Sequence, residues 1–262
     1  MPKLPLRALL IVAAACVGAI GVLAVQAPAR LIASAARNWS NAHVLLTETT
    51  GTIWDGQADC VLASADSVTA LHTRLPGRLA WHINPWRLLV GAVDLRVSDD
   101  AVLDAPLIMR FEGRASGTIE SGLMRLPAAA LAGLGAPWNT IRPGGALVLE
   151  WDTLHLSDRA LHGALRLQWL EASSSLTPVA PFGSYRLQAD GIFDGARLVL
   201  ETLSGPMELM GNGTIAQNLQ LHFQGRARVR AGTDEAIATQ LSGLVSLLGR
   251  SDGTGAILSF GT

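Results

Sequence analysis

The sequence is poor in charge and in lysine. Charged residues make up 16% of the 262 residues, against roughly 25% in a typical globular domain. The formal net charge is −1 and Lys3 is the only lysine, so the chain lacks the basic footprint of a nucleic-acid-binding protein. Hydrophobic residues make up 49% of the chain. This content excludes a disordered linker, because disordered chains have too little apolar surface to offset the entropy of ordering.

Motifs for catalysis, cofactors and metals are missing as well. The six histidines form neither HExxH nor a His-x₃₋₅-His pair, and no CxxC occurs, so no zinc or iron site is expected. The Gly-x-Ser-x-Gly, Walker A and Rossmann fingerprints are also absent. We therefore predict a protein that is not an enzyme, with no catalytic residue, no cofactor and no metal. We expect His155, His162 and His222 on water-exposed strand faces.

An uncharged apolar run occupies residues 8–25. Its eighteen residues are about the shortest helix that spans a hydrocarbon core of roughly 30 Å. Lys3 and Arg7 precede it, and the positive-inside rule then places the N-terminus in the cytoplasm. We predict a single-pass protein of the bacterial inner membrane, with a cytoplasmic tail (1–7), a transmembrane signal anchor (8–25), a juxtamembrane helix or linker (26–42) and a periplasmic β domain (43–262).

Two other interpretations of this segment stay open. A signal peptide ending at Ala27 would place Pro28 directly after the cut, and the run is longer than the 7–15 residues that a signal peptide needs. Cys16 follows three alanines, as a lipoprotein cysteine would, but the apolar run continues past it. Because Cys16 lies inside the run, a disulfide with Cys60 is not expected.

From residue 43 onward, apolar and polar residues alternate. Leu79, Trp81 and Ile83, for example, are separated by polar or small residues. Alternation with period two is typical of antiparallel strands with one buried face and one wet face. We therefore predict a mainly β fold, in which a long curved antiparallel sheet, a meander of hairpins, follows the transmembrane helix. A recurring Gly-Thr-Ile, at residues 51–53, 117–119 and 213–215, supports repeated hairpins.

Smaller features carry predictions of their own. Asn212-Gly213 predicts a hairpin turn, and Asp99-Asp100 predicts a solvated turn beside a strand. Trp39 is expected either at the level of lipid headgroups or in the core. Six further tryptophans lie on apolar strand positions or beside prolines and are predicted to pack in the core: Trp54, Trp81, Trp86, Trp138, Trp151 and Trp169.

Two helices are predicted within the β domain. Residues 127–134 begin with Pro127 at the first helical position and end at Gly133 or Gly135. Residues 233–249 begin with Thr233 as the cap and are predicted to cover an open end or face of the sheet. This second helix carries one apolar stripe, formed by Ile237, Leu241, Leu244, Val245 and Leu248. A final strand is expected at residues 256–260.

Three arginines, Arg226, Arg228 and Arg230, share one face of a predicted strand. No aromatic residues are interleaved with them, so a nucleic-acid surface is not expected. Two interpretations remain: a solvated strand face, or a docking face for acidic segments of partner proteins or for lipid headgroups. We carry these arginines as the candidate site.

The order and spacing of several motifs resemble protein N of the bacterial type II secretion system, over nearly the whole chain. These motifs are GTIWDG at residues 51–56, NPW at 84–86, LPAAALAGLGAPWNTIRPGG at 126–145, GSY at 183–185 and LSGP at 203–206. The resemblance implies a non-enzymatic accessory component that takes part in the export of folded proteins across the outer membrane. Its implied partners are the inner-membrane platform proteins and the outer-membrane secretin.

The resemblance also implies an alternative function. The family is similar in its sheet to AsmA-like proteins, whose long curved sheets form lipid-conducting grooves, so a periplasmic lipid-binding or lipid-transfer module is the second hypothesis. The two hypotheses differ in what Trp81, Trp151, Trp169 and Phe223 contact. A closed core containing all four favours a scaffold, whereas an open groove lined by them favours lipid.

Overall fold

The computed structural model describes residues 25–64, 72–113, 116–135, 138–157, 160–191, 195–216, 220–251, 253 and 255–261. The transmembrane segment predicted at residues 8–25 lies outside these residues except for Val25. Among the residues described, no helix has the length and apolar character needed to cross a membrane.

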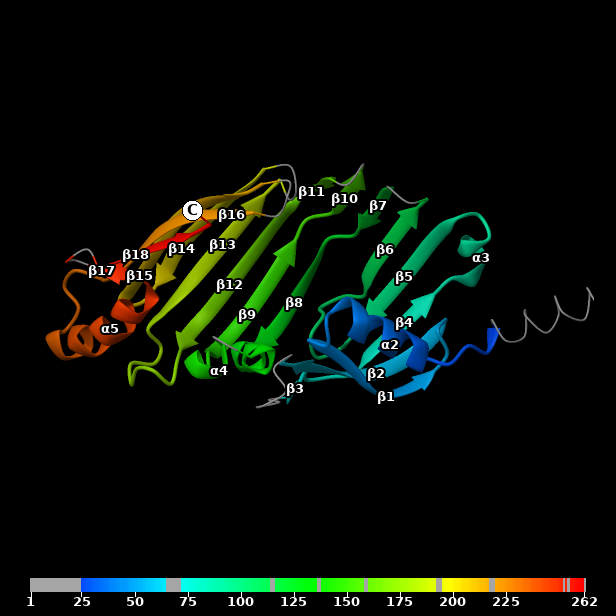
Figure 1. The fold of residues 1–262 in the computed structure, drawn as a ribbon, viewed down its shortest axis with the longest axis horizontal. Coiled ribbons are helices and arrows are strands. Elements are labelled where there is room, and N and C mark those ends of the chain that lie inside the picture. Colours follow the sequence, from blue (N-terminus) through cyan, green and yellow to red (C-terminus); the bar gives the residue numbers. More distant parts are fainter. Residues whose placement is uncertain are drawn as a thin grey trace, which may run out of the picture.

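The fold is mainly β, as predicted, but the strands of the described residues form two antiparallel sheets of nine strands each rather than one (Figure 1). The N-terminal sheet contains β1 (Val44–Gly51), β2 (Asp55–Ala63), β3 (His72–Arg74), β4 (Leu79–Ile83), β5 (Ala92–Ser98), β6 (Leu107–Glu112), β7 (Ser116–Ile119), β10 (Leu154–Ser157) and β11 (Ala160–His162). The C-terminal sheet contains β8 (Gly122–Pro127), β9 (Gly144–Trp151), β12 (Ala164–Ser173), β13 (Gly183–Asp190), β14 (Ala196–Ser204), β15 (Met207–Ile215), β16 (Leu221–Val229), β17 (Arg250–Ser251) and β18 (Ala256–Phe260).

The chain crosses between the two sheets three times. β7 leads into β8, β9 into β10 and β11 into β12, with breaks at residues 120–121, 152–153 and 163, which we call the seam. Trp151 fixes the seam, because its indole N–H donates to the backbone oxygen of Glu120 (2.7 Å). The prediction of one long sheet is therefore corrected: breaks in the strands divide the meander into two sheets that the same chain segments join.

Apolar side chains line one face of the C-terminal sheet in register. Met124 pairs with Leu149, Leu149 with Leu167, Leu167 with Leu187, and Leu187 with Leu200 across five neighbouring strands. Side chains at paired positions lie on the same face of a sheet and contact each other. The alternation seen in the sequence thus produces a continuous apolar row, while the intervening residues face the other side. His155, His162 and His222 are exposed on their strands, as predicted.

Aromatic rings pack closely against glycines of adjacent strands. The Trp81 ring covers Gly56, and the Trp151 ring covers Gly122, so closely that a Cβ atom at either glycine would overlap the ring. Both tryptophans are only 6% exposed. Glycine at these positions therefore provides the space in which a large ring packs against the sheet.

Phe223 shows the same arrangement and corrects one prediction. Its ring lies over Gly211 and Gly213, and it is 8% exposed. Asn212-Gly213 was predicted to form a hairpin turn, but both residues lie within β15, where Asn212 pairs with Gln224. The need for space beneath the ring explains the glycine in the strand.

Helices cover the two ends of this array, and Figure 1 shows α2 and α5 far apart. α2 (Arg30–Trp39) lies within the segment predicted as a juxtamembrane helix or linker. Buried Ala29, at its N-cap, and Ile32 pack with Ala58 and Trp81 of the N-terminal sheet. Trp39 ends α2 with 89% of its surface exposed, so it does not pack in the core.

The predicted C-terminal helix is present as α5 (Glu235–Leu248). Asp234, rather than Thr233, is its N-cap: its carboxylate accepts hydrogen bonds from the backbone N–H of Ala236 (2.9 Å) and Ile237 (3.4 Å). Leu241, Leu244 and Val245 of the predicted stripe are buried where α5 contacts β16 and β18, whereas Ile237 is 37% exposed. The prediction that this helix covers the sheet is confirmed.

The other predicted helix is a 3-10 helix, η1 (Ala128–Leu134). Pro127 is its N-cap and the last residue of β8, so it precedes the first helical residue that it was predicted to be. Two further short helices are α3 (Pro85–Leu88) and α4 (Trp138–Ile141).

Candidate functional site

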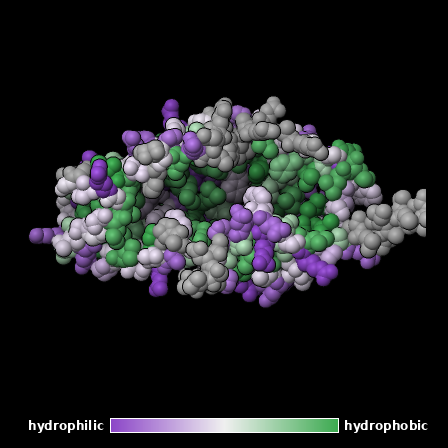
Figure 2. All heavy atoms as spheres, viewed as in Figure 1, coloured by the Kyte–Doolittle hydropathy of each residue, from purple (hydrophilic) through white to green (hydrophobic). Residues whose placement is uncertain are grey.

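A trough on the apolar face of the C-terminal sheet is the first candidate site. Its floor is formed by β8, β9 and β12–β15, and one wall is formed by η1 and α4. Its volume is about 510 Å³, and Figure 2 shows hydrophobic residues (green) in the hollow at the middle of the molecule. The trough is lined by Met124, Leu126, Leu131, Trp138, Pro143, Leu147, Leu149, Leu167, Trp169, Tyr185, Leu187, Leu200 and Leu209.

The polar atoms of the two aromatic residues in the trough floor are bonded to the backbone. The Trp169 indole N–H donates to the Gly144 oxygen (2.8 Å), and the Tyr185 hydroxyl donates to the Met207 oxygen (3.1 Å). Burial raises the pKa of Tyr185, with a smaller opposing effect from Arg230, so the hydroxyl stays neutral. These rings therefore offer apolar surface, without a free donor, to whatever the trough contacts.

The four aromatic residues whose contacts distinguish a closed scaffold from an open groove do not all agree: three are buried and one lines the trough. Trp81, Trp151 and Phe223 are buried, whereas Trp169 is half-buried and lines the trough. Packing thus closes the sheets at Trp81, at Trp151 of the seam and at Phe223, while the central part of the C-terminal sheet is open. Sequence reasoning did not place Trp138 in a wall of this trough, and the polar residues Asn139 and Thr140 that follow it in α4 gave no signal for this position.

The three arginines predicted as a docking face lie on β16 and just after it, on the polar side of the sheet. Arg228 and Arg230 both bind the carboxylate of Glu208, at 2.7 and 2.9 Å. Arg226 is exposed and pairs in register with Met210. The hydrogen bonds from Arg228 and Arg230 hold the pKa of Glu208 below its ordinary value. Sequence reasoning missed this glutamate, which the pairing of β15 with β16 places opposite Arg228.

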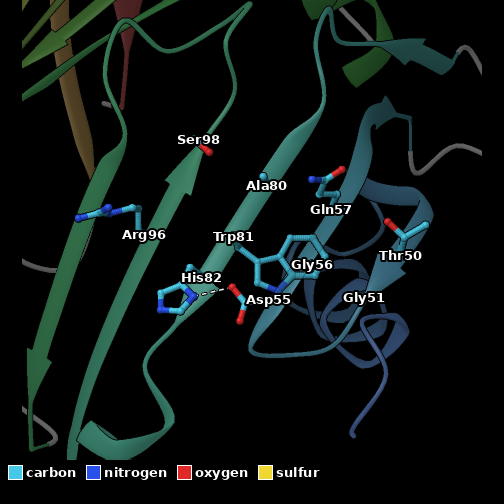
Figure 3. A pocket seen from close by; sticks show the side chains of 10 residues that line it. All are labelled: Thr50, Gly51, Asp55, Gly56, Gln57, Ala80, Trp81, His82, Arg96 and Ser98. Carbon is cyan, nitrogen blue, oxygen red and sulfur yellow. Dashed lines mark hydrogen bonds and ion pairs between the residues drawn. The ribbon is translucent and has the colours of Figure 1, made fainter. Parts of the chain in front are cut away.

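A second pocket, of about 440 Å³, lies across β1, β2, β4 and β5 (Figure 3). His82 and Asp55 point toward each other there, with Nδ1 and Oδ1 2.5 Å apart. A carboxylate that orients an imidazole is part of many hydrolase sites. Ser98, however, pairs with Ala80, two residues from His82, and two residues span about 7 Å along a strand. This serine is therefore out of hydrogen-bond range of His82.

Buried acidic and thiol groups lie elsewhere in the N-terminal sheet. Asp99 is 6% exposed and accepts a hydrogen bond from the Ala101 backbone N–H (3.0 Å), so the turn predicted at residues 99–100 is present but Asp99 is not solvated. Cys60 is a free, half-buried cysteine. Burial, and then the charge of Asp99, raise the pKa of its thiol, which disfavours the reactive thiolate. Within the described residues, no group of three or more His, Cys, Asp and Glu side chains is arranged to hold a metal.

The chain matches a known protein family. The family model described as "Type II secretion system (T2SS), protein N" matches residues 42–258. No curated protein and no solved structure matches the chain. The matched range begins just before β1 and ends within β18, so it takes in both sheets, the trough and α5. The chain belongs to the type II secretion system protein N family.

Proposed function

We propose that this component of the type II secretion system is a non-enzymatic accessory protein, anchored in the inner membrane by residues 8–25, whose β domain contacts other subunits in the periplasm. The family match over residues 42–258 carries the proposal. It is supported by the apolar run behind Lys3 and Arg7. The candidate partners are the inner-membrane platform proteins and the secretin.

The topology is tested with reporters. An alkaline phosphatase fused after Thr262 is expected to be active, because the enzyme needs an oxidising compartment, and a reporter that works only in the cytoplasm is expected to be silent. The reverse pattern, or a mature chain that begins near Pro28, refutes the anchor.

We propose the arginine face (Arg226, Arg228 and Arg230) as the contact with acidic segments of partner subunits. Changing all three to serine is expected to reduce co-purification of the other subunits, and the matched triple lysine variant, which keeps the charge, is expected to retain most of it. Raised salt weakens exposed ionic contacts, since charges are screened over roughly 8–10 Å at 0.1–0.15 M.

A change at Glu208 is expected to have the opposite effect on the association with partner subunits. Its carboxylate occupies both Arg228 and Arg230, so it competes with any acidic partner. Glu208→Gln keeps the side-chain shape and frees two guanidinium groups, and it is expected to strengthen the association that the serine triple weakens. If the amount of the other subunits that co-purifies is the same for all these variants and at both salt concentrations, the face is only a solvated surface.

A second candidate function is lipid binding in the trough, as in AsmA-like proteins. The observation that favours it is a row of half-buried apolar side chains around about 510 Å³ of open space, because exposed apolar surface of this extent normally has a ligand or partner. The candidate ligand is an acyl chain, because an extended apolar chain can lie along the row of apolar side chains that crosses neighbouring strands.

Neighbouring residues on β13 allow a matched test. Leu187 lines the trough, while Gln188 is the next residue of the strand, on its other face. Leu187→Asp is expected to remove lipid that co-purifies with the full chain, and Gln188→Asp to leave it in place. Leu187→Trp fills the trough without adding charge and is also expected to remove the lipid. Its loss of lipid cannot be attributed to unfolding caused by a buried charge. Equal lipid content in all variants, measured by mass spectrometry, refutes lipid binding at this site.

A further inference from the structure

The turn that joins β4 to β5 exposes an unusual amount of hydrophobic surface. We call residues 84–91, which include α3, the α3 loop. Trp86 is 75% exposed, Leu89 77% and Val90 73%, although Trp86 was predicted to pack in the core. Figure 2 shows hydrophobic residues at the end of the molecule where Figure 1 places α3. Hydrophobic side chains grouped in this way on a surface mark an interaction site.

The α3 loop is held in a defined shape. The Asn84 side chain accepts a hydrogen bond from the Trp86 backbone N–H (3.1 Å). The backbone N–H groups of Leu89 and Val90 donate to oxygens within the loop, at 3.3 and 3.2 Å. Arg87, the only charged residue of the loop, forms an ion pair with Asp94 of the sheet (3.1 Å). The loop therefore presents the apolar side chains of Trp86, Leu89 and Val90, with Leu88 41% exposed beside them. The backbone amides of these three residues are bonded, and the charge of Arg87 is paired.

Backbone hydrogen bonds connect this loop to the point where the chain enters the fold. The Ile53 N–H donates to the Ala27 oxygen (2.9 Å), and the Ile83 N–H donates to the Trp54 oxygen (2.7 Å). Ile83 is followed directly by the α3 loop, and Ala27 lies two residues after the apolar run of residues 8–25. The loop and the end of the apolar run thus lie at the same end of the molecule, while α5 lies at the opposite end (Figure 1).

We propose that the α3 loop inserts Trp86, Leu89 and Val90 into the interfacial layer of the bilayer that holds the N-terminal anchor. The partner is a phospholipid surface. Tryptophan favours the level of the lipid headgroups, and backbone amides that are bonded internally avoid the penalty that unsatisfied ones meet in lipid. A second point of contact holds the β domain in one orientation above the membrane. This inference rests on the anchor in the proposed function.

Two exposed leucines at opposite ends of the molecule make the test. In the full chain carrying Cys16→Ala and Cys60→Ala, either Leu89→Cys or Leu247→Cys is labelled with a bimane dye. Leu247 is 69% exposed on α5, so both sites accept the dye with little effect on packing. The labelled chains are reconstituted into vesicles of phosphatidylethanolamine and phosphatidylglycerol, with or without lipids that carry bromine in their acyl chains.

The dye at position 89 is expected to emit at shorter wavelength and to lose most of its fluorescence to brominated lipid, whereas the dye at 247 is expected to behave as in water. Carbonate washing separates the two proposals. A chain that stays in the vesicles while the dye at 89 behaves like the dye at 247 overturns the inference alone. A chain released by carbonate overturns the anchor and the inference with it. Shielding of position 89 only when other secretion subunits are added assigns the loop to a protein and also overturns the inference.

Discussion

The contribution of α5 packing to stability can be measured by comparing a buried leucine, Leu241, with an exposed one, Leu247, on the same helix. Leu241 is 0% exposed in the C-terminal core, and Leu247 is 69% exposed. Replacing either by alanine changes helix propensity by the same amount, so the difference between the two variants isolates the packing of α5 on β16 and β18. A buried Leu→Ala change costs about 2–5 kcal/mol, whereas an exposed one stays within about 0.5 kcal/mol.

For a domain of this size, each kcal/mol shifts the melting temperature by about 2–4 °C, so Leu241→Ala is expected to lower it by about 4–20 °C. Leu247→Ala is expected to change it by about 2 °C or less. Circular dichroism of the detergent-solubilised full chain, heated at one scan rate, gives both values, and urea unfolding gives the free-energy difference if the slope is unchanged. Equal melting temperatures for the two variants would show that α5 does not pack on the sheet and does not stabilise it by covering β16 and β18.

Three other predictions concern single residues. The lowered pKa of Glu208 means that its ionised form stabilises the fold above the ordinary pKa and that this stability is lost as pH falls; Glu208→Gln should therefore flatten the acid side of the stability-against-pH curve, measured by urea unfolding. Gly122→Ala drives a Cβ into the Trp151 ring and should cost about 1–3 kcal/mol, while Gly243→Ala, in open space on α5, should stabilise by up to about 1 kcal/mol; equal effects would contradict the ring-over-glycine packing. Cys60, whose thiol pKa is raised, should react with iodoacetamide more slowly than a cysteine in a short unfolded peptide at the same pH, and an equal rate would contradict its burial.

Much of the fold is predictable because it follows from periodicity. Alternation fixes which side chains of β4 and β13 share a face, and the apolar stripe of residues 237–248 identifies α5. The division into two sheets is not predictable in this way. Residues 120–121 and 152–153 lead from one sheet to the other, but nothing in their sequence distinguishes them from an ordinary turn between strands of the same sheet. The pairing of β7 with β10 beside the seam depends on contacts between segments distant in the sequence.

The site was predicted less well, again for physical reasons. The arginines were found by counting along one strand, but Glu208, which binds two of them, belongs to the neighbouring strand and appears only when the register is known. Local preferences also gave way to packing. Asn212-Gly213 favours a turn by itself, yet it lies in β15 because Phe223 needs the glycine. Trp86 has the large apolar side chain expected of a core residue, yet it is exposed to solvent.

The seam also determines the order in which the protein can fold. Synthesis proceeds from the N-terminus, and β5, β6 and β7 each pair with the strand made just before, so these hairpins close short loops at a small entropic cost. β7 and β8, by contrast, must wait for β10 and β9, which follow η1 and α4 in the chain. Until then two strand edges remain unpaired, and unpaired edges are where chains join one another. The nascent chain is therefore most prone to aggregate when synthesis has passed β8 and has not yet completed β10.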